Sequence, residues 1–383
     1  MHVGVLVLRA DHSCEVPMTL TKSLSIFFLA MLAGLSHGND MIRMSGYGSI
    51  VLGQVMDGSA YVADYPNLGI YDDEWDIGQE SRFGLQMNAT INDELSATVQ
   101  VVSRANNDYE AQVEWMFINY AFNDDLELQA GKLRVPVYYY SEYMDVGIAY
   151  PWVRVPADAY SLDVTSFNGL QLNHRMFMGN TSFTTAFYTG RAKNENSELM
   201  SYLFDNDPGD VTGTGSANVD RYFTNIVGIG FEVNMDSTIF KASYTQADFD
   251  ETIVNSFTAE ADGTIKFMDI FIQQNFGPMS VMLEYNDYDP FYSSYFASFN
   301  YTLGQATYYL MHSKFELDAT DGTGTPFEEH DTNALGMRYN LSAKVAVKAD
   351  ITMMTDTGAS PVNRDPDGDG DVTIFSTSLD FMF

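Results

Sequence analysis

The sequence predicts an all-β fold: a transmembrane antiparallel β-barrel of about sixteen strands. It ends on an alternating apolar run, short and long connections alternate along it, and it contains no stretch of helical periodicity. The terminal run places aromatic or apolar side chains at nearly every second position: Phe375, Thr377, Leu379, Phe381 and Phe383. Because successive side chains of a strand point to opposite faces, this run predicts a strand with one apolar face. The alternative is an edge strand of a soluble β-protein that ends on an aromatic residue.

The N-terminus predicts an export signal. Leu24 to Leu35 is an apolar run of signal-peptide length, preceded by Lys22 and followed by small residues. It is too short to be a membrane-spanning helix. We expect residues 1–38 to comprise an N-terminal extension and a cleaved signal peptide, with 39–383 as the mature barrel. Asp11 and Glu15 are unusual before such a run, so translation is expected to start at Met18.

Composition and charge restrict the class of protein further. The formal net charge is −33, and a polyanion of this kind is a poor partner for nucleic acid. The single cysteine precedes the apolar run, so the mature chain has no disulfide. Aromatic residues make up 14% of the chain, as expected if tyrosine and phenylalanine form girdles at the two membrane interfaces. A tyrosine-rich secreted β-sandwich is the alternative, although the length favours a barrel.

Turn residues divide the mature chain into strands. Seven short connections are marked by Asn, Asp, Gly or Pro, at 92–93, 123–125, 178–180, 234–236, 277–278, 302–304 and 341–342. Eight longer connections are expected at 56–79, 104–111, 135–164, 191–221, 249–263, 289–293, 317–330 and 356–371. Strict alternation of eight long and seven short connections joins sixteen strands, the layout of a membrane barrel.

Individual strands show the alternation expected of a barrel wall. One face of the strand near residue 230 is expected to carry Phe223, Asn225, Val227, Ile229, Phe231 and Val233. One face of the strand near residue 350 carries Val345, Val347, Ala349, Ile351 and Met353, with Lys344, Lys348 and Asp350 opposite. The apolar faces would meet lipid and the polar faces would meet the lumen.

Taken together, residues 41–383 resemble the sixteen-stranded Gram-negative porins, particularly those of marine gammaproteobacteria. The segment from Gly131 to Pro156 (GKLRVPVYYYSEYMDVGIAYPWVRVP) carries most of the likeness. The resemblance implies the bacterial outer membrane, contact with its lipid, a homotrimer and passive diffusion of small hydrophilic solutes and ions. It also implies that the third long loop, 135–164, folds into the barrel. The terminal strand departs from the family at 376–378, where this chain has Ser-Thr-Ser.

A loop that packs against an inner wall needs apolar surface, which Tyr138, Tyr140 and Trp152 supply. Its acidic Glu142 and Asp145 are expected to face basic side chains of the wall. By the alternation, those are Arg43, Arg82, Arg175, Arg338, Lys344 and Lys348. Opposed charges in a narrow passage set up a transverse field that orients polar solutes. The alternative is that these cations only neutralise nearby carboxylates.

Two further motifs suggest metal binding. Asp365, Asp367, Asp369 and Asp371 match the start of a Ca²⁺ loop, but the closing glutamate and the flanking helices are missing. A solvated acidic loop is therefore the preferred interpretation, with Ca²⁺ as the alternative. The cluster Glu328-Glu329-His330-Asp331 offers metal-ligand residue types, yet it is expected to lie solvated in a polar loop.

No enzymatic activity and no required cofactor are expected, because no G-x-S-x-G elbow accompanies the few histidines. The predicted function is an outer-membrane porin. The alternatives are a channel specific for an oligosaccharide or organic acid, and a secreted or surface β-protein with adhesive loops.

Overall fold

The computed structural model describes residues 41–203, 218–254, 258–320, 323–359 and 370–383. The expected signal region, 1–38, and most of the acidic loop at 365–371 lie outside these ranges. The chain divides into two compact units, 1–43 and 44–383, and the second forms nearly the whole barrel. Within the described residues, no helix is long and apolar enough to cross a membrane.

Sixteen antiparallel strands form a closed barrel, which confirms the predicted fold class. The first eight are β1 (Ile42–Asp57), β4 (Arg82–Thr90), β5 (Leu95–Arg104), β6 (Ala111–Asn123), β7 (Leu126–Arg134), β8 (Ser166–Met178), β9 (Thr181–Asn194) and β10 (Asn218–Met235). The second eight are β11 (Thr238–Val254), β12 (Thr258–Phe276), β13 (Met279–Asp289), β14 (Tyr292–Leu303), β15 (Ala306–Leu317), β16 (Glu329–Ser342), β17 (Val345–Asp356) and β18 (Asp371–Met382).

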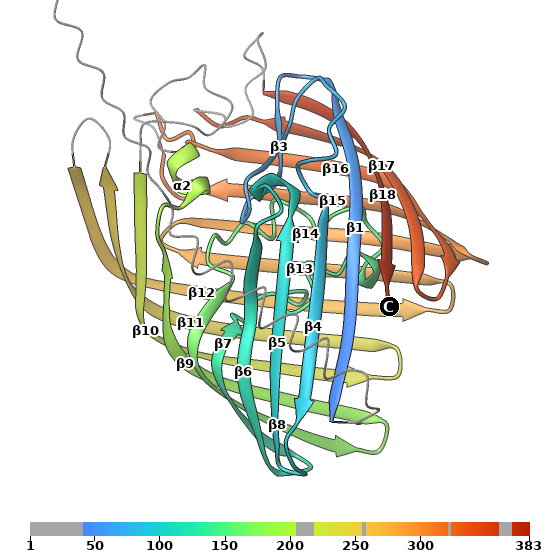
Figure 1. The fold of residues 1–383 in the computed structure, drawn as a ribbon. Coiled ribbons are helices and arrows are strands. Elements are labelled where there is room, and N and C mark those ends of the chain that lie inside the picture. The colour runs from blue at the N-terminus through green and yellow to red at the C-terminus, as the bar shows by residue number, and fades with distance from the viewer. Residues whose placement is uncertain (1–40, 204–217, 255–257, 321–322, 360–369) are drawn as a thin grey trace, which may run out of the picture. The chain divides into compact units, whose positions relative to one another are not determined.

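The two ends of the chain close the barrel. Figure 1 shows β1, in blue, beside β18, in red, and the two strands pair from Tyr47 with Met382 to Asp57 with Thr373. In β18 the predicted alternation is present, because Ile374, Ser376, Ser378 and Asp380 are buried while Leu379 is exposed. Closure leaves no unpaired strand edge, as a lipid environment requires.

The outer surface carries a band of exposed apolar side chains between two rows of tyrosines. Tyr301, Tyr308 and Tyr339 lie near the short turns, and Tyr244, Tyr285 and Tyr295 lie nearer the long loops. Between them, Leu283, Phe299, Leu310, Leu335 and Ile351 are each more than 40% exposed. A band of this kind is typical of a lipid-facing wall.

Six of the seven predicted short turns overlap the turns between consecutive strands, whereas residues 341–342 end β16 and the turn is at 343–344. Some of the long connections also differ. The expected connection 249–263 is mostly strand, since β11 and β12 stay paired from Phe249–Gly263 to Val254–Thr258. Asp and Gly residues suggest a loop, yet a strand that extends beyond the membrane also tolerates them. The expected connection 289–293 is only two residues long, between β13 and β14.

A bulge corrects the predicted face of β10. The pairing with both neighbours shifts between Phe223 and Val227, and Asn225 has a positive φ of 51°. Phe223 is therefore buried inside, whereas Val227, Ile229 and Phe231 remain outside. One inserted residue inverts the alternation, so a pattern extended across the bulge assigns Phe223 to the wrong face.

The first long connection contains a hairpin of its own, β2 (Tyr61–Asp64) and β3 (Gly69–Tyr71), which forms a separate two-stranded sheet. The other local elements in the described part of the chain are a short helix α2 (Glu198–Leu203) and two 3₁₀ turns, η1 (Ala105–Asn107) and η2 (Gly147–Ala149). The third long connection, residues 135–165 between β7 and β8, includes the second of these turns and is named the inner loop.

Candidate functional site

The inner loop lies within the barrel, because it contacts inward-facing side chains on distant strands. The Tyr139 ring stacks on Phe271 of β12 at 3.9 Å between centroids. Trp152 Nε1 donates to Ser298 Oγ of β14 at 3.0 Å. Ser313 Oγ of β15 donates to Asp158 Oδ2 at 2.6 Å. The three wall residues are at most 2% exposed, so the loop fills the space against β12–β15.

Three of the basic residues predicted on the inner wall bind the inner loop through its backbone. Arg82 Nε donates to the carbonyl oxygen of Asp145 at 3.0 Å. Arg338 Nη1 donates to the carbonyl oxygens of Ile148 and Tyr150, at 2.7 and 2.9 Å. Lys348 Nζ donates to those of Gly147 and Trp152, both at 2.6 Å. Each cation therefore satisfies carbonyl groups that a buried loop would otherwise leave without partners.

The 3₁₀ turn of the inner loop requires a glycine. A Cβ added at Gly147 would lie 2.1 Å from Asp380 Oδ1 and 2.5 Å from Ser49 Oγ. Lys348 Nζ lies 3.1 Å from Asp380 Oδ2, so an ion pair of the wall sits directly against this turn. A side chain at position 147 would push the loop away from its anchor.

The other three predicted basic residues have exposed side chains. Arg175 is exposed on β8 and lines a cavity at the short-turn end. Lys344 was predicted on the lumen face of the strand that carries Val345. It is instead exposed in the turn between β16 and β17 and is not part of the wall. Arg43 is exposed near the start of β1.

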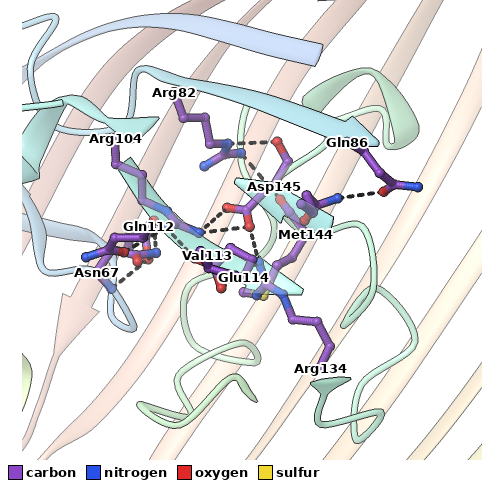
Figure 2. Close-up of polar contacts among 12 residues, drawn as sticks. Asn67, Arg82, Gln86, Arg104, Gln112, Val113, Glu114, Arg134, Met144 and Asp145 are labelled. Carbon is purple, nitrogen blue, oxygen red and sulfur yellow. Dashed lines mark hydrogen bonds and ion pairs between the residues drawn. The ribbon is translucent and has the colours of Figure 1, made fainter. Parts of the chain in front are cut away.

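Asp145 is the centre of a buried charge cluster (Figure 2). Both of its carboxylate oxygens accept from Arg104 Nη2, at 3.0 and 2.9 Å, and Arg134 Nη2 also donates to it. Glu114 of β6 pairs with the same two arginines, at 2.6 Å to Arg104 and 3.5 Å to Arg134. Two carboxylates and two guanidinium groups thus balance one another inside the wall of β5–β7.

The environment of Asp145 keeps it ionised. Burial by itself would raise the pKa of this carboxyl, but Arg104, Arg134 and Arg82 lie close enough to hold the pKa well below its usual range. An ionised group with two charged partners serves to fix the loop against the wall, and its charge is cancelled locally rather than presented to solutes.

Sequence alternation did not single out the partners of Asp145. Arg104 and Arg134 end their strands, where the alternation offers few positions, and Glu114 is the extra residue at a shift in the β5–β6 pairing. A second buried network was also missed: Arg154 of the inner loop donates to Glu80 at 2.7–3.0 Å and to Ser376 Oγ of β18 at 2.7 Å. The only sequence signal for either network is that arginine is scarce in a chain this acidic.

The aromatic residues of the inner loop are packed against the wall. Tyr138 and Tyr140 are each 3% exposed and Trp152 is 1% exposed. Tyr138 meets Phe267 edge to face at 5.3 Å, and Trp152 meets Phe296 at 5.4 Å. These rings belong to an apolar core that extends from Leu133 to Ala334 and includes residues of the inner loop and of β7–β16.

His330 is not in a solvated loop, as the sequence suggested, but fully buried at the second position of β16. Its Nδ1 lies 3.4 Å from Asp158 of the inner loop, and its Nε2 lies 3.1 Å from Glu328 and 3.3 Å from Asp356. Glu329 instead pairs with Lys314, at 2.7 Å. No group of three His, Cys, Asp or Glu residues among the described residues has the geometry to hold a metal ion.

The possible Ca²⁺ ligands Asp365, Asp367 and Asp369 lie outside the described residues. Asp371 is described, and it is the exposed first residue of β18. Calcium binding by this loop therefore stays a prediction.

The two ends of the barrel interior differ in how they are filled. In the half nearer the long loops, each strand from β10 to β18 contributes an inward side chain no more than 9% exposed, for example Phe223, Phe249, Phe267, Tyr288, Tyr292, Phe315, His330, Met354 and Ile374. Toward the short turns, by contrast, lies a cavity of about 810 Å³. We call this cavity the vestibule. Glu142 of the inner loop is exposed in it, together with Arg175, Glu232 and Lys241.

The geometry is that of a barrel whose interior is narrowed by a loop and continues into an open vestibule. Several solved structures share the fold. An in-vitro folded trimer form of OmpT, an outer membrane protein of Vibrio cholerae, is 14% identical with a TM-score of 0.57, over 89% of this chain and 99% of that chain. The outer membrane channel DcaP of Acinetobacter baumannii is 9% identical with a TM-score of 0.59, over 89% and 97%. An anion-selective porin from Comamonas acidovorans is 13% identical with a TM-score of 0.53, over 89% and 99%.

A search of curated proteins finds no match. The profile of the Gram-negative porin family, however, matches residues 25–359 of the 383 in the chain. Family and fold agree with the lipid-facing band and with the loop inside the barrel. The chain therefore belongs to the Gram-negative porin family and is a channel of the bacterial outer membrane for passive diffusion.

Proposed function

We propose that this porin passes small hydrophilic solutes with a preference for cations, and that the vestibule sets this preference. The observation that carries the proposal is the imbalance of charge around the vestibule. Its acidic lining residues are Asp93, Glu94, Asp124, Asp125, Glu127, Glu142 and Glu232, and its basic ones are Arg175 and Lys241.

The physical reason is that carboxylates on low-dielectric walls raise the local concentration of cations and lower that of anions. Buried carboxylates that have a cationic partner contribute little to this field. Asp145 and Glu114 are paired with Arg104 and Arg134, and Asp380 is paired with Lys348. These three carboxylates are therefore balanced at the level of the inner loop, whereas the vestibule lining carries an excess of acidic residues.

A planar-bilayer recording tests the proposal. The purified barrel, with a KCl gradient across the membrane, is expected to give discrete conductance steps and a reversal potential of the sign set by K⁺ permeation. Exchanging K⁺ for a bulky organic cation should lower the current more than exchanging Cl⁻ for a bulky anion. A reversal potential set by Cl⁻ would contradict the proposal.

The structural neighbours leave this preference open. One of them is described as anion-selective, but an identity of 13% carries the fold alone. We propose a homotrimer, with the outer apolar band facing lipid, and one neighbour described as a trimer form supports this assembly. We also propose that the protein has no catalytic activity, which family membership supports.

A channel specific for an oligosaccharide is the second candidate. It would need aromatic faces that a sugar could contact, but Tyr138, Tyr140 and Trp152 are buried against the wall. Tyr139 and Tyr143 at the edge of the vestibule are the remaining candidates. A saturable block of the current by an added sugar would favour this function over general diffusion.

A further inference from the structure

The hairpin β2–β3 is buried on both of its faces. Tyr61, Val62, Ala63 and Tyr71 are each at most 3% exposed, and Tyr65 in the turn is 4% exposed. A hairpin at a water-facing barrel mouth would alternate between buried and exposed side chains. This hairpin is therefore enclosed by other parts of the molecule.

One face of the hairpin packs on the barrel wall. Tyr61, Ala63 and Tyr71 form an apolar cluster with Val55 of β1, Met354 of β17, and Val372 and Ile374 of β18. A Cβ added at Gly53 would lie 2.7 Å from the Tyr71 ring, so the ring lies directly over the backbone of β1. Glycine at position 53 makes this close approach possible.

The hairpin is also attached to the inner loop. Arg154 of the loop lies over the rings of Tyr61 and Tyr71, at 5.8 and 5.9 Å from their centroids. The same guanidinium binds Glu80, which follows the hairpin, and Ser376 of the wall. One buried arginine thus connects the hairpin, the inner loop and β18.

The turn of the hairpin reaches a different part of the wall. Tyr65 Oη donates to Glu328 Oε1 at 3.2 Å and lies 3.3 Å from His330 Nδ1. Its ring also stacks on Phe315 of β15 at 6.4 Å. The hairpin therefore extends from β1 and β18 at one side to β15 and β16 at the other, inside the half of the barrel near the long loops.

Little space remains between the hairpin and the inner loop. The crevice there is lined by Asp64, Arg82, Asp145 and Arg154 and has a volume of about 20 Å³. That is room for about one water molecule. The vestibule on the other side of the inner loop is about 810 Å³. On the hairpin side, a cavity of about 620 Å³ remains between the hairpin turn at Asn67 and the strand ends at Arg104 and Lys132.

We infer that the β2–β3 hairpin is a second constriction element of the pore, which together with the inner loop sets the size limit for diffusing solutes. This inference rests on the proposed passage through the barrel. The hairpin narrows the path of solutes on the long-loop side, and the acidic vestibule selects solutes by their charge on the other side.

Shortening the hairpin tests the inference. Residues 61–71 would be replaced by four glycines, a length that reconnects the chain because Tyr61 and Tyr71, at the two ends of the segment, are paired across the hairpin. Single-channel conductance in KCl is expected to rise about twofold or more, since the narrowest section governs the current. Liposome swelling should show entry of larger uncharged sugars than the wild-type barrel admits.

A point variant keeps the test valid if the shortened barrel does not fold. Tyr65→Ala removes the contacts with Glu328 and His330 and should raise conductance or open-channel noise. The control is Tyr109→Ala, at an exposed tyrosine of the β5–β6 connection, which should leave both unchanged.

Three outcomes separate the possibilities. Higher conductance and a larger size limit in either hairpin variant support the inference. Folded variants with wild-type conductance and size limit overturn it, while the cation preference measured in the same recordings stands. Silence of the wild-type and variant barrels, each folded by its heat-modifiable migration, overturns the proposed function and the inference with it.

Discussion

Glu142 and Asp145 lie three residues apart on the inner loop, yet they meet opposite environments. Asp145 is 4% exposed and paired with Arg104 and Arg134, whereas Glu142 is exposed in the vestibule. The same contrast holds for the two halves of the interior. Along β10–β18 the half near the long loops is packed like the core of a soluble domain, whereas a cavity of about 620 Å³ remains beside Arg104, Lys132 and Lys193. The half near the short turns is open and acidic.

The sequence predicted the same role for Glu142 and Asp145, but the structure separates anchoring of the inner loop from selection of ions. A charge that is buried among opposite charges stabilises one arrangement of the loop. Because its partners neutralise it, it produces only a weak electric field where solutes pass. A charge in open water costs little to maintain and acts on every ion that passes. Anchoring and selection are therefore carried by different carboxylates of one loop.

The largest expected effect comes from Asp145→Asn. Removing one charge leaves Arg104 and Arg134 with only Glu114 as a carboxylate partner, and breaking a buried ion network of this kind costs about 3–5 kcal/mol of stability. Urea unfolding of the detergent-solubilised barrel measures the loss. Glu142→Gln is the matched control, and as an exposed substitution it should change stability by less than about 0.5 kcal/mol. Equal losses in the two variants would mean that Asp145 and Glu142 contribute equally to stability, contrary to the proposed difference.

Lys348→Met should have the next largest effect. Its ammonium binds the carbonyl oxygens of Gly147 and Trp152 and pairs with Asp380, all within a fully buried site. Its removal leaves an unpaired buried carboxylate and should cost about 3 kcal/mol. Proteolysis of the folded barrel near residue 147 should also become faster. The control is Lys344→Met, in an exposed turn, and a comparable loss there would argue against a specific anchoring role.

Acid should reveal the contribution of Asp145. Because its pKa is depressed in the folded state, its stabilisation is present above the unfolded pKa of about 3.9 and is lost as pH falls through the lower folded value. The difference in unfolding midpoint between wild type and Asp145→Asn should stay constant from neutral pH to about pH 5 and shrink below about pH 4. A difference that disappears already between about pH 7 and 5 would mean that another group is responsible.

The smallest expected effect is the most informative about selection. Glu142→Gln removes one of seven acidic lining residues of the vestibule and should lower the ratio of K⁺ to Cl⁻ permeability by about twofold or less. Reversal potentials at low and high salt measure it, and the shift should be larger at low salt because screening is weaker. Asp145→Asn barrels that remain folded should keep a ratio closer to that of wild type.

The sequence predicted the wall better than the interior. Alternation and turn residues are local signals, so the terminal strand and six of the seven short turns could be located from them, and the seventh lies two residues beyond its predicted position. The alternation assigned Phe223 to the wrong face because the bulge at Asn225 adds one residue, and this inverts the faces of the residues on one side of it. The extended ladder between Phe249 and Gly263 was missed because acidic residues are compatible with a water-exposed strand as well as with a loop.

Within the candidate site, the sequence identified Arg82, Arg338 and Lys348 as inner-wall cations but not what they bind. Their partners are backbone carbonyls, which every residue carries and no composition signal marks. Arg104, Arg134 and Glu114 were missed for a related reason, since they lie at strand ends or beside a register shift.

What the sequence determined by itself is the architecture: an alternating period of two, punctuated by turn residues, gives strands with one apolar face, and in lipid only a closed sheet leaves no strand edge unpaired. What only the tertiary structure decided is the state of each charge and the width of the route. Asp145, Arg154 and Tyr65 acquire their roles from residues 11 to 265 positions away. Such contacts depend on how the loops fold back into the barrel, because the free energy of a buried charge is set by its surroundings rather than by its neighbours in the chain.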